Sequence, residues 1–153
     1  MIITLTIDCI GGIYLKEEWR RVMEFDSGSS LCDVHLAIQN AINFDNDHLF
    51  EFYAGKHFRN RKIEFVDSLD LETPFEFIDS FDEITLDQVY PLPKGLKLYY
   101  HFDFGDSWMF EIKKSRKKPR EPEPGVQYPR IVEKIGENPE QYPRYDEEEE
   151  YEG

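Results

Sequence analysis

Cysteine is scarce in this sequence, which contains only Cys9 and Cys32, far apart along the chain. The two do not form a C-x-x-C pair, and no histidine stands at zinc-ligand spacing from either of them. These absences exclude a disulfide framework and a cysteine-ligated zinc site. We expect two buried free thiols in a protein from a reducing compartment.

Long hydrophobic runs are also absent, and no apolar stretch approaches the length that spans a membrane. The first residues alternate isoleucine and leucine with threonine and have no basic segment before them, which is typical of a strand and not of a signal peptide. We therefore expect a soluble, cytoplasmic protein with no membrane partner.

Positive charge is in short supply, with 18 basic against 32 acidic residues and a formal net charge of −14. Such a chain is repelled at long range by nucleic acid and by anionic membranes. One basic segment, residues 113–120, departs from this balance and is a candidate for binding nucleic acid, or else it pairs with acidic residues of the same molecule. Its candidate binding residues are Lys113, Lys114, Arg116, Lys117 and Lys118.

Aromatic residues are abundant, with 12 Phe and 9 Tyr, and these types favour half-buried strands. One helix is expected from Ser30 to about Asn43, opened by a capping box of Ser30 and Asp33. The pattern predicts an α+β fold in which this one main helix packs on one face of a curved mixed, mostly antiparallel sheet built from hairpins.

We expect one domain over residues 1–136 and an acidic tail over 137–153. The expected strands are residues 3–7, 19–25, 48–53, 63–66, 96–104, 108–114 and 130–135, and residues 67–83 form an irregular excursion.

Four stretches of this sequence together resemble one known family. They are Trp19-Arg20-Arg21-Val22, Leu31-x-Asp33-x-His35-x-x-Ile38-Gln39, His48-Leu49 followed by Glu51-Phe52, and Asp103-Phe104-Gly105-Asp106-x-Trp108. This pattern resembles the plasmid family named for the third open reading frame of an agrobacterial Ri plasmid, whose members also occur as passengers of insertion elements. The resemblance implies one α+β domain, no established enzymatic activity and a circumstantial link to mobile DNA.

The sequence departs from that family at several positions. The family often has Tyr where His101 stands, and His where Phe50 and Phe110 stand. Near the C-terminus it tends to have Pro-Pro-Glu-Asp where this chain reads Asn138-Pro139-Glu140-Gln141. The loss of histidines and of a carboxylate argues against an inherited catalytic or metal-binding role.

His101, Asp103 and Asp106 are the candidate catalytic and metal-binding residues. In a strand, His101 and Asp103 share a face, and a bulge at Gly105 could turn Asp106 toward them. One imidazole and two carboxylates suit Mn, Fe or Zn, which could activate water for hydrolysis. The alternative is that both aspartates accept hydrogen bonds in the turn and pair with arginine. No cofactor is predicted apart from this divalent metal.

Arg21 shares its predicted strand face with core residue types, so we expect its guanidinium to be at least partly buried and to need carboxylate or carbonyl partners. The prediction is that Arg21, or Arg20 if the register differs by one, pairs with Asp103 or Asp106. Together with Trp108 these residues would form a structural clamp between two hairpins.

No motif in the sequence specifies an activity. The leading hypothesis is a non-catalytic interaction module, with a protein partner ranked above nucleic acid. The alternative is a metal-dependent hydrolase that uses His101, Asp103 and Asp106.

Overall fold

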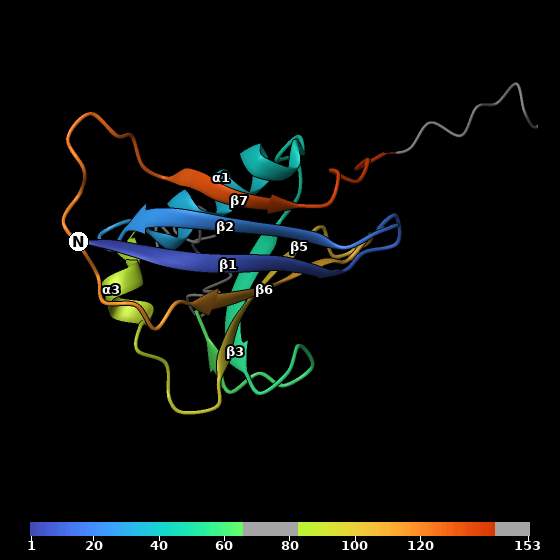
Figure 1. The fold of residues 1–153 in the computed structure, drawn as a ribbon. Helices are drawn as coiled ribbons and strands as arrows, with labels where there is room; N and C mark the ends of the chain where they lie inside the picture. Colours follow the sequence, from blue (N-terminus) through green and yellow to red (C-terminus); the bar gives the residue numbers. More distant parts are fainter. Residues whose placement is uncertain (66–82, 143–153) are drawn as a thin grey trace, which may run out of the picture.

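Seven strands and two helices make up the part of the chain that the computed structural model describes, residues 1–65 and 83–142 (Figure 1). The predicted irregular excursion over residues 67–83 lies almost wholly outside these ranges, and so does most of the predicted acidic tail over residues 137–153. The elements are β1 (Ile2–Gly11), β2 (Trp19–Asp26), α1 (Leu31–Ile42), β3 (Phe50–Gly55), β4 (Ile63–Glu64), α3 (Leu86–Val89), β5 (Lys97–Phe102), β6 (Trp108–Lys114) and β7 (Arg130–Ile135).

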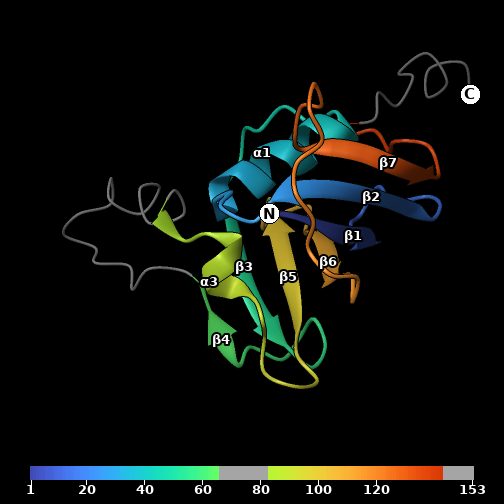
Figure 2. The same cartoon turned by 60° about the vertical axis from the view of Figure 1, so that its left-hand side comes forward.

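All seven strands belong to one sheet with the order β4-β3-β5-β6-β1-β2-β7, and each neighbouring pair is antiparallel. The predicted α+β class, with a mixed sheet and one main helix on a face, is therefore wrong. The described chain is mainly an antiparallel sheet with two short helices, of 12 and 4 residues. A mixed sheet would need a parallel pair, in which a crossover connection such as a helix joins two neighbouring strands. Here the connection through α1 leads from β2 to β3, which lies near the opposite edge of the sheet, so it creates no parallel pair (Figure 2).

The ends of α1 are defined by the local sequence. The Ser30 hydroxyl accepts a hydrogen bond from the Asp33 backbone N–H at 3.1 Å, and the Asp33 carboxylate accepts one from the Ser30 N–H at 2.9 Å. This is the predicted capping box, which satisfies two N–H groups that the first helical turn leaves without partners. The helix ends at Asn43, which adopts a left-handed conformation with φ of 62°.

The inner face of the sheet carries the core, and α1 and α3 cover it (Figure 2). The helical spacing predicts a buried face of Leu31, Val34, Ile38 and Ala41, with Asp33 and Asn40 exposed. Leu31, Val34 and Ile38 are fully buried and the two polar residues are exposed, as predicted, whereas Ala41 is only half-buried. Burial of apolar surface of this kind supplies most of the stabilisation of a fold. The sheet contributes Leu5, Ile7, Trp19, Phe25, Phe52, Tyr100, Phe102, Trp108, Phe110 and Ile112.

The outer face has a small apolar cluster of its own, made by Tyr53, Tyr99 and Met109 from β3, β5 and β6. Their side chains point away from the main core because successive residues of a strand alternate between the two faces. The Arg61 guanidinium lies over the Tyr53 ring at 4.2 Å, and Glu51 and His101 stand on the same face, two positions away along β3 and β5. The outer face of β3, β5 and β6 is therefore the surface on which the candidate site is built.

The two cysteines lie in different surroundings. Cys9 is buried, as expected, and Cys32 is half-buried. Burial raises the pKa of the Cys9 thiol to about 12, so this thiol stays protonated at neutral pH and is a poor nucleophile.

Candidate functional site

The turn between β5 and β6, residues 103–107, is shaped by Asp103. One oxygen of the Asp103 carboxylate accepts hydrogen bonds from the backbone N–H groups of Gly105 and Asp106, at 3.1 and 3.2 Å. Asp103 and Ser107 both adopt left-handed conformations, with φ of 59° and 56°. Such conformations are uncommon for residues other than glycine, and they cluster at functional sites.

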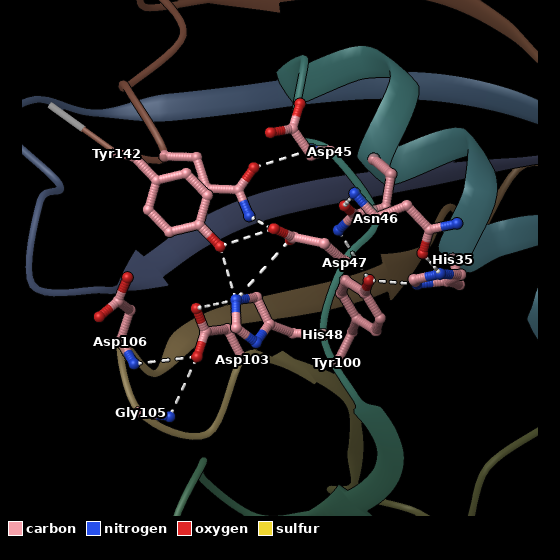
Figure 3. Close-up of polar contacts among 12 residues, drawn as sticks. His35, Asp45, Asn46, Asp47, His48, Tyr100, Asp103, Gly105, Asp106 and Tyr142 are labelled. Atoms are coloured by element: carbon pink, nitrogen blue, oxygen red, sulfur yellow. Dashed lines mark hydrogen bonds and ion pairs between the residues drawn. The ribbon is translucent and has the colours of Figure 1, made fainter.

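The second oxygen of the Asp103 carboxylate lies 3.3 Å from Nε2 of His48, which comes from the segment before β3 (Figure 3). The same His48 nitrogen is 2.5 Å from the Tyr142 hydroxyl, and that hydroxyl donates to the Asp47 carboxylate at 2.8 Å. Burial, followed by the negative charge of Asp103, raises the pKa of Asp106. The result is a cluster at the tip of the β5–β6 hairpin in which His48 lies 3.3 Å from Asp103 and 3.7 Å from Asp47, and Asp106 is hydrogen-bonded to Asp103.

The segment before Tyr142 fastens this tip to the body of the protein. The Asn138 side-chain oxygen accepts hydrogen bonds from the Trp19 indole N–H at 2.8 Å and from the Arg21 guanidinium at 3.0 Å. Gln141 accepts from the Asp45 N–H at 2.7 Å and donates to Asp47 at 2.8 Å. These are two of the positions where the sequence departs from the family pattern, and they have structural roles that sequence reasoning missed.

Arg21 is buried, as predicted, with 4% of its surface exposed, but it does not form the predicted clamp. Its guanidinium donates to the carbonyl oxygens of Arg20, Ile135 and Gly136 at 2.8 to 3.0 Å. Carbonyl oxygens are one of the two partner types that the sequence predicts for a buried guanidinium at this position.

The other predicted clamp residue, Arg20, pairs with Asp8 at 2.7 Å. The physical reason for both outcomes is strand order: β1 lies between β2 and β6, and β7 flanks β2 on the other side. The hairpin that carries Asp103, Asp106 and Trp108 is therefore not the neighbour of Arg20 and Arg21.

His101 lies on the outer face, away from the Asp103–His48 contact. Its Nδ1 is 2.9 Å from the Glu51 carboxylate, its Nε2 is 3.0 Å from the Ser107 hydroxyl, and its ring stacks on Phe104 with 4.9 Å between centroids. The candidate triad of His101, Asp103 and Asp106 is not brought together, because the left-handed Asp103 ends the alternation of the strand. Within residues 1–65 and 83–142, no group of three His, Cys, Asp or Glu residues is arranged to hold a metal ion.

Glu51 is held from two sides. Arg61 donates to both oxygens of its carboxylate at 2.7 Å, and Nδ1 of His101 lies 2.9 Å from one of these oxygens. Burial by itself would raise the pKa of Glu51, but the hydrogen bonds from Arg61 and His101 lower it to about 2. Glu51 is therefore a carboxylate at neutral pH.

Beside Ser107 the outer face has a pocket of about 310 Å³. Its apolar wall is made by Ile10, Ile13, Phe58 and Met109, and its polar wall by Asp106 and Ser107. Ile10, Ile13 and Phe58 are exposed by 41%, 60% and 42%. Apolar side chains gathered around one hollow in this way are typical of a binding surface.

The backbone of Gly11 and Gly12 completes the pocket. Gly12 requires its glycine, because a Cβ there would lie 2.4 Å from the Trp108 ring. The close approach of this backbone to Trp108 fixes the position of the pocket relative to the β5–β6 turn.

The basic segment is partly paired with acidic residues. Lys113 lies 3.3 Å from Glu111, and Arg120 pairs with Glu24. Arg116, Lys117 and Lys118 are exposed and Lys114 is half-buried. A role for this segment in binding nucleic acid stays a prediction.

These features define a class: a domain built on one antiparallel sheet, with a polar cluster and an apolar pocket at one hairpin tip. The model of the plasmid pRiA4b ORF-3-like protein family matches residues 13–142, and the chain belongs to this family. The sequence-based assignment is therefore confirmed. The function of the family is uncharacterised.

A solved structure with the same fold is that of a protein of unknown function from Methanosarcina mazei Go1. It is 20% identical, the match covers 87% of this chain and 68% of the other, and the TM-score is 0.62. None of the curated protein sequences matches this chain significantly. No helix in the described ranges is both long and apolar enough to cross a membrane.

Proposed function

We propose that this protein is an interaction module that binds a protein partner through the pocket beside the β5–β6 turn. The observation that supports this proposal is the group of exposed apolar side chains, Ile10, Ile13 and Phe58, around one hollow. Exposed apolar side chains that are scattered singly need no explanation, whereas a contiguous set marks an interaction site.

The charge of the surroundings defines the partner. Asp106 lines the pocket and is hydrogen-bonded to Asp103, and both Asp103 and Asp47 lie within 4 Å of His48. The protein as a whole carries a net charge of −14. Because complementary potentials favour association and like charges oppose it, the partner segment carries Lys or Arg next to one apolar side chain.

A peptide selection tests this proposal. A displayed library of random peptides is selected against the full-length protein, and the binders are sequenced. We expect peptides with an aliphatic or aromatic residue beside Lys or Arg. Their affinity should fall at least ten-fold with Ile13→Asp and stay within two-fold with Val132→Asp, a matched change at an exposed apolar residue on β7.

Two results would overturn the proposal. One is a selection that returns no binders or binders without the basic and apolar pair. The other is an affinity that responds equally to the two substitutions, because the pocket would then not be the binding surface.

A further inference from the structure

Ser107, His101 and Glu51 form a line of three side chains on the outer face. The Ser107 hydroxyl is 3.0 Å from Nε2 of His101, and Nδ1 of the same ring is 2.9 Å from the Glu51 carboxylate. The three residues come from the β5–β6 turn, from β5 and from β3, so only the folded sheet brings them together. A nucleophile, a base and a carboxylate that orients the base are recognised by this geometry and not by their order in the sequence.

The carboxylate determines which nitrogen of His101 carries the proton. Glu51 accepts hydrogen bonds only, because it is ionised at neutral pH. Nδ1 of a neutral His101 therefore carries the proton and donates a hydrogen bond to Glu51. Nε2 keeps its lone pair, which is directed at the Ser107 hydroxyl. Arg61, which binds both oxygens of Glu51, holds the carboxylate in this orientation.

Ser107 is also placed for reaction. It is exposed, so a substrate can reach it, and it lines the pocket formed by Ile13, Phe58 and Met109. Its φ of 56° is a conformation that non-glycine residues adopt at a cost, and such strain clusters at active sites. Ser115, in contrast, uses its hydroxyl to accept a hydrogen bond from the Lys117 backbone.

We propose that Ser107 is a nucleophile activated by His101, and that it hydrolyses uncharged or cationic carboxylic esters with an apolar acyl group. The pocket would take the apolar group, and Asp106 at its wall would disfavour anionic substrates. This activity goes beyond the binding of a protein partner.

The reaction has two halves. Ser107 Oγ attacks the ester carbonyl carbon while its proton passes to Nε2 of His101, and the tetrahedral adduct expels the alkoxide, which takes that proton and leaves as an alcohol. Water then attacks the acyl-serine carbonyl and gives a proton to Nε2. The second adduct releases the carboxylic acid as Ser107 Oγ regains the proton. Glu51 stabilises the imidazolium in both halves and is a positioning residue.

The test uses an alkyl fluorophosphonate probe, which labels activated serines, on the full-length protein. Peptide mapping should place the label on Ser107, and Ser107→Ala should remove it. His101→Gln should slow labelling by about 100-fold, the usual contribution of a general base, whereas Ser115→Ala should leave the rate unchanged. Turnover of p-nitrophenyl butyrate should show the same order among the variants. Circular dichroism confirms that each variant is folded.

A second variant keeps the proposal testable if labelling is slow. The thiol of Ser107→Cys should react with iodoacetamide at least ten times faster than that of Ser115→Cys at neutral pH, because His101 promotes the thiolate. The role of Glu51 is read by ¹⁵N NMR, in which His101 should be the Nδ1-protonated tautomer in the wild type and a mixture in Glu51→Gln. Labelling elsewhere than Ser107, labelling that His101→Gln does not slow, or equal alkylation of the two thiols would overturn the proposal.

Discussion

Replacement of Glu51 by glutamine removes one negative charge from the outer face while keeping the size of the side chain. Glu51 is largely buried, with 15% of its side chain exposed, and it accepts two hydrogen bonds from Arg61 and one from His101. Glutamine offers a single acceptor oxygen, and its NH₂ group faces donors. We therefore expect Glu51→Gln to destabilise the protein at neutral pH.

The size of the effect follows from the pKa of Glu51, which is lowered from its ordinary value of 4.5 to about 2. This pKa difference of about 2.5, at about 1.4 kcal/mol for each pKa unit, corresponds to a stabilisation of the folded state by about 3 kcal/mol. Because the folded pKa is the lower one, this stabilisation is complete above pH 4.5 and is lost as the pH falls toward 2. The wild type and Glu51→Gln should therefore differ by about 3 kcal/mol at pH 7 and by much less near pH 2.

Urea unfolding followed by tryptophan fluorescence measures this difference, because Trp19 and Trp108 are both buried. The matched control is Glu64→Gln, since Glu64 also lies near Arg61, at 3.9 Å, but is 58% exposed. This change should cost well under about 1 kcal/mol, as is usual for exposed ion pairs. A loss in Glu51→Gln that is the same at pH 7 and near pH 2, or no larger than in the control, would refute the reasoning.

Three further predictions concern the interior. Ile38→Ala should cost about 2–5 kcal/mol in urea unfolding because Ile38 is fully buried, whereas Leu36→Ala, at a residue 47% exposed on the same helix, should cost less than about 1; equal costs would contradict the helix orientation. Arg21→Met should cost about 2–4 kcal/mol in urea unfolding because it leaves three carbonyl oxygens without their donor. Arg20→Met, which breaks only the ion pair with Asp8, should cost less than about 1 kcal/mol. A larger cost for Arg20→Met would contradict the burial of the Arg21 guanidinium among carbonyls. Burial lowers the pKa of His35 to about 4 from an ordinary 6.5. Between these two pH values the unfolded state binds more protons than the folded state, so the free energy of unfolding should fall by up to about 3 kcal/mol as the pH drops from 6.5 to 4. The fall should be clearly smaller in His35→Gln. Identical pH profiles of stability for the wild type and the variant would contradict this prediction.

Local sequence was sufficient for the features that depend on near neighbours. The alternation of Ile3, Leu5 and Ile7 with polar residues placed these three in the core, and all are buried. The capping box of Ser30 and Asp33 set the start of α1, because its partners are three residues apart. The hairpin of β5 and β6 followed from two adjacent strands around a short turn.

Strand order, in contrast, came only from tertiary pairing. The strands expected at residues 3–7 and 19–25 are consecutive and pair as the hairpin of β1 and β2. The sequence did not indicate that β6 lies on the other side of β1 or that β7 flanks β2. These pairings bring together residues as distant as Arg21 and Ile135, which are 114 positions apart. The alternation of a strand carries no information about which strand it pairs with. The incorrect fold class and the incorrect partners of Arg21 have this single origin.

The candidate site shows the same division. His101 was singled out from its sequence surroundings, but Glu51 lies 50 positions before it and was predicted only as part of a strand. The left-handed backbone at Asp103 then turned that side chain from the face of His101 toward His48, which no period-two pattern can anticipate. Residue types and local periodicity determined which side chains face in and which face out. The packing of distant strands decided which polar groups meet, because a hydrogen bond depends on position in space and not on separation along the chain.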